Sequence, residues 1–314
     1  MEEKLAVIEK QPGSLEPLGL REQPGADRPR ARASLLPGLF VFLLGSVIAY
    51  VYAFLLYPRQ GLIQPVIDLN GFGQLARHLA HGDGFSLGYG PTLRRAPLYP
   101  AFAALLLRLC GSSGPEALVY RPVLLAQCLM VGLTCLSAFA LARKLFGERT
   151  GLVAGLLCAL TPQVYRYVGM TEVETSLGLL LVLMALTGLN LYRRPTVSTG
   201  ALFGLVVGAA TLVKPLPLFY PFVFLPLVFW AWKKQGRTKG QAEAGTGRNG
   251  QGQGLRGLLA SLVVFVLCVL PWVVRNGLVS HGQFWGISSN GPGEFLRGYV
   301  NVEPQFVLLR QDFG

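Results

Sequence analysis

Long uncharged runs alternate with short polar segments along this sequence. Residues 35–57 carry no charged side chain, and comparable apolar runs recur at 122–142, 150–165, 175–192, 195–213, 215–232 and 257–274. A helix needs about 20 apolar residues to cross a hydrocarbon core about 30 Å thick. The pattern therefore predicts an all-α, multi-pass transmembrane bundle of about seven spans, with residues 35–274 as the transmembrane domain.

The basic residues predict how this bundle is oriented. Cytoplasmic loops of membrane proteins carry an excess of Lys and Arg. With alternating spans, every loop on the side of the N-terminus is basic, and the segment 233–256 alone has six Lys or Arg against one acid. We therefore expect the cell's inner membrane, a cytoplasmic N-terminus and an active site on the outer face. The residues that set this orientation are Arg28, Arg30, Arg32, Arg143, Lys144, Arg149, Arg193 and Arg194.

Three segments lie outside the spans by composition. Residues 1–34 mix six acids with six Lys or Arg, Pro and Gly, and have no apolar periodicity, which predicts a disordered cytoplasmic tail. The Gly- and Gln-rich segment 233–256 predicts a flexible cytoplasmic loop. Residues 275–314 are expected on the outer face, and the chain stops there without a closing domain, as a truncated form of a longer protein would.

Residues 58–115 form the longest stretch of mixed polarity between two spans, and we expect this stretch to be an outer catalytic loop. Residues 65–80 predict an amphipathic surface helix. The apolar run 96–107 is too short to cross a membrane and predicts an interfacial or re-entrant segment. A Gly-rich turn, HGDGFSLGYG, joins the two. The apolar side of the first helix would carry Leu69, Phe72, Leu75, Ala76 and Leu79.

Composition agrees with a membrane protein and argues against other classes. The chain is 52% hydrophobic and 14% charged, whereas soluble domains average about 25% charged residues. Its net charge of +12 does not indicate nucleic acid, because the basic residues flank apolar runs instead of gathering on a folded face. The five cysteines have no metal-ligand spacing. With no DxD motif and only three histidines, no motif requires a divalent metal.

Three acids on the predicted outer side are candidate catalytic residues. Asp68 precedes the surface helix, where a carboxylate complements the helix dipole or acts as a general base. Glu172 and Glu174 lie where one span ends outside and the next begins. They mark the membrane boundary or face a polar cavity, because charge is costly deeper in the bilayer.

Four cations also fall on the outer side, where topology does not favour positive charge: Arg94, Arg95, Lys214 and Arg275. They are snorkelling anchors or they hold an anion. A base beside several cations is suited to transfer of a group from a lipid phosphate. The base deprotonates the attacking hydroxyl or amine, and the cations stabilise the departing phosphate.

An ordered set of motifs resembles one family. Asp68 is followed by Phe72, LARHLAHGDGF, PTLRRAPLYP, the pair Thr171 and Glu172, GALFGLVVGAATLVKP, and LPWVVRNGLVSHGQFWGISSNGPG. Together, over roughly residues 35–300, they resemble the membrane-embedded GT-C glycosyltransferases. These include the dolichyl-phosphate-mannose protein mannosyltransferases and the lipid A aminoarabinose transferase, and the bacterial branch is the most similar.

The resemblance implies a polyprenyl-phosphate-linked sugar donor and inverting transfer at the outer face. It implies Asp68 as the base and Glu172, with Glu174 as the competing choice, as the second acid. Arg95 near Pro97, Lys214 in place of the usual Arg, and Arg275 would contact the lipid phosphate, with Arg94 beside them. Phe72 stands where the family has Tyr. The later spans and outer C-terminal domain of the family have no counterpart in this sequence.

Two other classes remain open. A polyprenyl-lipid flippase or transporter needs ionisable residues near the middle of its spans, whereas here they cluster at one boundary. A non-catalytic, transferase-like membrane protein is the second alternative. The sequence leaves open the sugar, the oligomeric state and the acceptor, which is a protein in protein glycosylation, lipid A in lipid A modification, or another glycan. Besides these substrates, only membrane lipids are expected as partners.

Overall fold

The computed structural model describes residues 35–56, 68, 70–88, 90–111, 120–240 and 247–290. The predicted tail 1–34, the end of the chain from 291 and the start of the predicted surface helix at 65–67 lie outside these residues. The elements are α2 Leu35–Val51, η1 Tyr52–Leu56, α3 Phe72–His81, α4 Leu98–Cys110, α6 Arg121–Phe146, α7 Glu148–Leu160, α8 Pro162–Tyr165, α9 Glu174–Arg193, α10 Val197–Val213, η3 Leu216–Phe219, α11 Tyr220–Gly240 and α12 Gly247–Val279.

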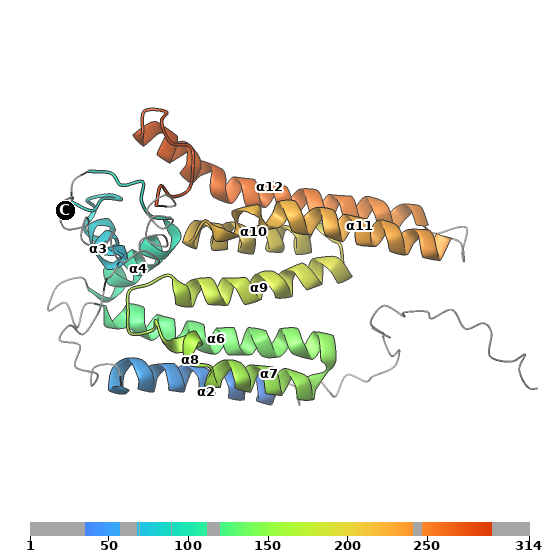
Figure 1. Cartoon of the computed structure of the whole chain (residues 1–314), viewed down its shortest axis with the longest axis horizontal. Helices are drawn as coiled ribbons and strands as arrows, with labels where there is room; N and C mark the ends of the chain where they lie inside the picture. The colour runs from blue at the N-terminus through green and yellow to red at the C-terminus, as the bar shows by residue number, and fades with distance from the viewer. Residues whose placement is uncertain are drawn as a thin grey trace, which may run out of the picture.

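The long helices form one layered bundle (Figure 1). Helix α6 packs on α2, α7 and α9, while α10 packs on α9 and α12. Successive helices run in opposite directions, so α3, α4 and the start of α9 lie at one end, and the turns after α6 and α9 lie at the other (Figure 1). The prediction of an all-α helical bundle is confirmed, and the described residues contain no strand, only an isolated bridge between Ser86 and Pro91.

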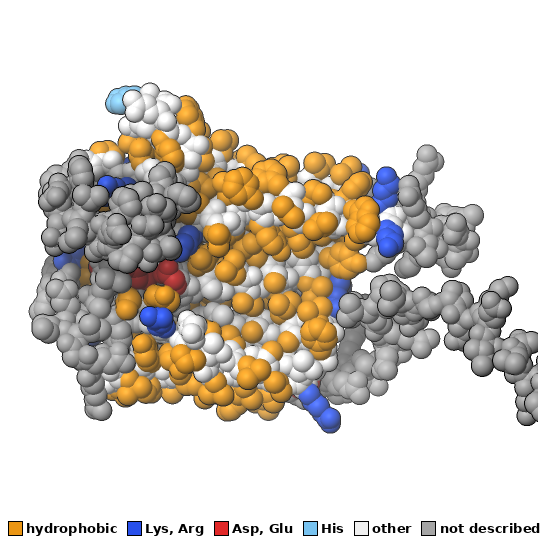
Figure 2. Space-filling model, in the orientation of Figure 1, with side chains coloured by type: hydrophobic (Ala, Val, Ile, Leu, Met, Phe, Trp, Pro, Cys, Tyr) orange, Lys and Arg blue, Asp and Glu red, His pale blue; other side chains and the backbone are white. Residues whose placement is uncertain are grey.

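Five segments are long and apolar enough to cross a membrane: Leu35–Leu56, Arg121–Phe146, Glu174–Arg193, Leu216–Lys234 and Gln253–Val279. The other two predicted spans correspond to α7 with 13 residues and α10 with 17. At 1.5 Å per residue these are only about 20 and 26 Å long. Large apolar side chains cover the flanks of the bundle (Figure 2), as expected of a multi-pass membrane protein whose outer surface meets lipid.

Three glycines allow α10 and α12 to approach closely. Gly200, Gly204 and Gly208 recur every fourth residue on the face of α10 that meets α12. A Cβ atom at Gly204 would collide with the backbone oxygen of Ser261, and one at Gly208 would lie 2.7 Å from the Cβ of Cys268. Small residues at this spacing let helix backbones pack tightly in membranes. The contact fixes the end of α10, which precedes Lys214, relative to the end of α12.

The two surface helices are present with changed boundaries. The first was predicted over 65–80, but α3 begins at Phe72, because Gly71 adopts a left-handed conformation with φ 75° and interrupts the helix there. Gly82 ends α3 in the same way. Phe72, Leu75 and Ala76 are buried as the apolar pattern predicts. The run 96–107 becomes α4, whose buried face packs on α3 and α6.

The flexible loop predicted over 233–256 is shorter than its composition suggests. Helix α11 continues to Gly240 and α12 begins at Gly247, so most of the segment is helical. Adding a residue to an existing helix needs no new nucleus, and two spanning helices extend into the polar segment from either side. The flexibility of this segment stays a prediction, and residues 241–246 lie outside the described part.

Candidate active site

A small apolar cluster supports the polar residues at the end of the bundle that carries α3 and α4. It joins Phe72 of α3, Tyr99 of α4, Val173 and Leu177 around the start of α9, and Val213 at the end of α10. The neighbours of these residues in sequence are polar: Glu172 and Glu174 flank Val173, and Lys214 follows Val213. Burying the apolar members therefore holds these three charged residues at one end of the bundle.

Asp68 lies against the first turn of α3. Its Oδ2 accepts a hydrogen bond of 2.9 Å from the backbone N–H of Gln74, so the helix-end interaction considered from the sequence is present. The glycine at position 73 permits this approach, because a Cβ there would lie 3.1 Å from Oδ2. The second oxygen, Oδ1, is buried and has no hydrogen-bond partner among the described residues. One oxygen thus anchors the carboxylate and leaves the other able to accept a proton.

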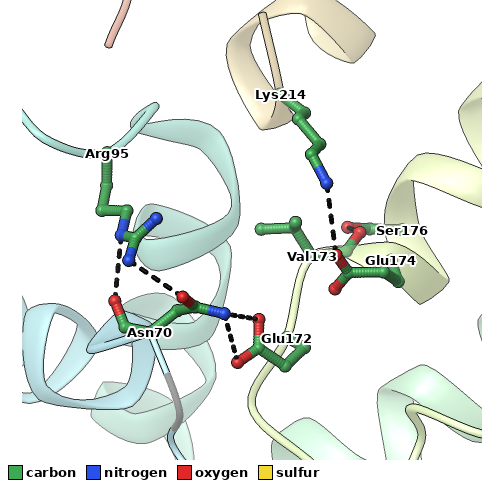
Figure 3. A network of polar contacts seen from close by, with 7 residues as sticks. All are labelled: Asn70, Arg95, Glu172, Val173, Glu174, Ser176 and Lys214. Atoms are coloured by element: carbon green, nitrogen blue, oxygen red, sulfur yellow. Dashed lines mark hydrogen bonds and ion pairs between the residues drawn. The ribbon is translucent and has the colours of Figure 1, made fainter. Parts of the chain in front are cut away.

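Glu172 is held by a fixed amide (Figure 3). Its side chain is buried, and Asn70 Nδ2 donates to both carboxylate oxygens, at 2.9 and 3.0 Å. Arg95 holds Asn70 from the other side. Its Nε donates to the backbone oxygen of Asn70 at 2.9 Å and its Nη2 to Oδ1 at 3.0 Å. We call Arg95, Asn70 and Glu172 the amide network.

Burial raises the pKa of Glu172 to about 7. The hydrogen bond from Asn70 opposes this rise, the carboxylates of Glu174 and Asp68 add to it, and the charge of Arg95 opposes it. Removing a carboxylate from water disfavours its ionised form. Glu172 therefore exchanges its proton near neutral pH.

Glu174 does not share the partner of Glu172. One of its oxygens accepts from Lys214 Nζ at 3.3 Å (Figure 3), and the other is buried without a partner among the described residues. Roughly half of the Lys214 side chain remains exposed. A pair this exposed contributes about 0–1 kcal/mol to stability, so Lys214 can leave Glu174 at little cost and meet an incoming anion.

Arg275 joins α12 to the segment between α3 and α4. Its Nη1 donates to the backbone oxygen of Thr92 at 2.9 Å and to Asn276 Oδ1 at 2.8 Å. Its guanidinium also lies over the rings of Trp272 and Phe85, with 4.7 and 5.5 Å to the ring centroids. The plane is oriented by two aromatic rings, while Nε and Nη2 have no hydrogen-bond partner among the described residues.

The two adjacent arginines differ in their contacts. The Arg94 side chain is exposed, and its backbone oxygen accepts from Ser288 Oγ. Arg95 is half-buried, lies over the Phe72 ring with 5.1 Å to the centroid, and directs two donors at Asn70. Phe72, which stands where a tyrosine was expected, therefore serves as an apolar platform for Arg95. Contact of either arginine with a phosphate stays a prediction.

Sequence reasoning missed two residues that organise this end of the molecule, Asn70 and Gln127. Asn70 links two predicted site residues, although an asparagine in a Gly-containing segment carries no signal of its own. Gln127 is completely buried in α6; it accepts from the Tyr99 hydroxyl and donates to the backbone oxygens of Val168 and Met170. A lone Gln in the apolar run 122–142 was a usable signal, because a polar side chain in a span needs partners.

The structure brings the predicted site residues to one end of the bundle, in two linked groups. One group lies around the apolar cluster and consists of Asp68, Glu172, Glu174, Arg95 and Lys214. Arg275 meets the segment between α3 and α4 through Thr92, three residues before Arg95. Acidic side chains visible on one face gather mainly at this end (Figure 2). The described residues contain no group of three or more His, Cys, Asp or Glu suited to hold a metal ion.

Comparison with known proteins adds one finding. Residues 94–243, just under half of the chain, match the family model described as dolichyl-phosphate-mannose-protein mannosyltransferase. The match confirms the resemblance to the GT-C glycosyltransferases. Five of the site residues fall within the matched segment, whereas Asp68, Asn70 and Arg275 lie outside it. No curated protein and no solved structure matches the chain.

Proposed function

We propose that this protein transfers a sugar from a polyprenyl-phosphate donor to an acceptor at the outer face of the membrane. The family match supports a GT-C glycosyltransferase that uses a lipid-linked sugar. The observation that carries the finer proposal is the Asp68 carboxylate, with one oxygen anchored on Gln74 and the other without a hydrogen-bond partner among the described residues. A general base must be held in place and still have an oxygen to take the proton.

The proposed reaction is a single displacement. The Asp68 carboxylate removes the proton from the acceptor hydroxyl or amine as that atom attacks the sugar C1. The bond between C1 and the phosphate oxygen breaks, and its electron pair leaves with the lipid phosphate, so the product is inverted at C1. Lys214 and Arg275, with Arg94 and Arg95 near them, stabilise the negative charge that develops on this phosphate.

A lipid flippase is the competing function, and the position of the charges favours the enzyme. Flippases need ionisable groups near the middle of their spans. The acids of the site lie before or at the start of α9 and before α3, at one end of the bundle. Incubation of the purified chain with a radiolabelled polyprenyl-phosphate sugar and an acceptor extract separates the two. Transfer releases the unglycosylated lipid phosphate, whereas a flippase leaves the donor intact.

Replacing Arg275 tests the phosphate site. We expect Arg275→Ala to raise the apparent KM for the donor about 10- to 100-fold, because a hydrogen bond to a charged group contributes about 1.5–3 kcal/mol. Arg275→Lys keeps the charge but loses the paired N–H donors of the guanidinium, so its apparent KM should lie between that of the unmodified protein and that of Arg275→Ala. Arg108→Ala is the matched control, since Arg108 also donates to a backbone oxygen at this end of the bundle, that of Ala80. An unaltered donor dependence in Arg275→Ala would refute the phosphate role.

A further inference from the structure

The amide of Asn70 has a defined orientation, because its two ends meet different groups. Its oxygen receives a donor from Arg95, and its nitrogen donates to Glu172 (Figure 3). A guanidinium cannot accept a hydrogen bond and a carboxylate cannot donate one. Exchanging the amide oxygen and nitrogen would therefore place donor against donor and acceptor against acceptor. The network has one arrangement when Glu172 is ionised.

Asn70 lies between Arg95 and Glu172 (Figure 3). The guanidinium donates to the backbone and side-chain oxygens of Asn70, and the amide nitrogen of Asn70 donates to Glu172. The buried carboxyl group thus receives a neutral donor.

We propose that Asn70 is a positioning residue that couples Arg95 to Glu172 and sets both the orientation and the proton affinity of this second acid. This role rests on the proposed function, in which Glu172 is a proton-exchanging group near the base Asp68. It follows that Glu172 loses its negative charge below neutral pH, and a neutral Glu172 repels a donor phosphate less. Because Asn70 follows Asp68 by two residues, its hydrogen bonds attach Glu172 to the segment that carries the base.

The groups that face Glu172 come from four elements. Asp68 and Asn70 precede α3, Arg95 precedes α4, and Tyr99 lies in α4, where its own pKa is raised first by burial and then by Glu172. Glu174 begins α9, and Lys214 follows α10 and neutralises part of the Glu174 charge. Among these, the Asn70 hydrogen bond is the largest influence that lowers the pKa of Glu172. Its removal should therefore raise that pKa.

The test measures protonation of Glu172 without any sugar transfer. A hydrophobic carbodiimide reacts with a protonated carboxyl group, and mass spectrometry of the solubilised full chain locates the adduct. Labelling of Glu172 should be half-maximal near pH 7. In Asn70→Ala the midpoint should move upward by about one pH unit or more, the equivalent of a lost hydrogen bond to a charged group. Asn190→Ala is the matched control, because Asn190 accepts from Lys144 at the opposite end of the bundle.

The direction of the shift separates positioning from mere structural damage. An opened structure would expose Glu172 to water and move its midpoint downward, toward that of an ordinary glutamate. Arg95→Lys provides a second variant. Lysine keeps the charge but cannot donate to both oxygens of Asn70 as Arg95 does, so the labelling midpoint of Glu172 should again move upward. Because Arg95 acts through Asn70, the double variant Asn70→Ala with Arg95→Lys should move the labelling midpoint of Glu172 little more than Asn70→Ala alone.

An unchanged or lowered midpoint in a folded Asn70→Ala chain would overturn the proposal, as would fully additive shifts in the double variant. If Asn70→Ala does not fold, the midpoint of Arg95→Lys is the test. A midpoint in Arg95→Lys that does not move upward would then overturn the proposal. Failure of the transfer assay would not affect these readouts. The positioning role and the proposed glycosyltransferase activity can therefore fail independently.

Discussion

Asp68→Asn should reduce sugar transfer by about 10²- to 10⁴-fold, the range in which a general base contributes. Asparagine has nearly the same shape, and its side-chain oxygen can still accept from the Gln74 N–H that holds Asp68 Oδ2 at 2.9 Å. The fold around α3 should therefore be retained, and the lower rate of sugar transfer should come from the loss of proton transfer. Initial rates with a labelled donor at saturating concentration provide the measurement, and donor KM should change little.

The matched control for this substitution is Asp83→Asn. Asp83 lies in the segment between α3 and α4, but its exposed carboxylate pairs with His78 at 3.4 Å and with none of the described site residues. Its variant should keep nearly full activity. An Asp68→Asn chain that retains more than half of the normal rate would show that another group removes the proton.

Gly204→Leu should prevent assembly of the bundle. A Cβ atom at this position collides with the Ser261 carbonyl oxygen on α12, and backbone cannot yield as a flexible side chain can. Overpacking a core costs about 1–3 kcal/mol and sometimes more. Separation of α10 from α12 would also open the apolar cluster that contains Val207 of α10 and Leu258 and Phe265 of α12. We expect most of the monodisperse protein to disappear in detergent gel filtration.

Gly178→Leu is the control for this effect. Gly178 lies in α9, and a Cβ there would meet no atom within 4 Å, so leucine should be accepted with little change in yield. Equal yields of the two variants would contradict the tight contact between α10 and α12. A smaller substitution, Gly204→Ala, should give an intermediate loss, because alanine has the Cβ but nothing beyond it.

Hydropathy predicted the spans well because lipid imposes a length and a composition that can be read along the chain. The first span, predicted over 35–57, ends at Leu56, and the one predicted over 175–192 runs from Glu174 to Arg193. The boundaries failed where backbone conformation decides. Gly71 stops α3 from extending toward Asp68, and an apolar pattern contains no information on a positive φ angle.

The site was predicted in its residue types more fully than in its contacts. Arg95 was placed on a phosphate by its charge, yet in the structure it directs two donors at Asn70, 25 residues earlier. Glu172 and Glu174 were alternatives for one role, but they have separate partners: a neutral amide for the first and Lys214 for the second. Such pairings depend on how loops distant in sequence meet, which local patterns do not encode.

The contact between the segment that joins α3 to α4 and the end of α12 bears on how the protein is made. Thr92 accepts from Arg275, and Leu93 from Ser289, across more than 180 residues of chain. During synthesis, the segment that carries Asp68 leaves the ribosome long before these partners exist. The segment between α3 and α4 therefore lacks these two contacts until the last described helix has been made. The end of the bundle that carries Asp68 is thus the last to acquire all of its contacts, and any activity that depends on it is delayed until the bundle is assembled.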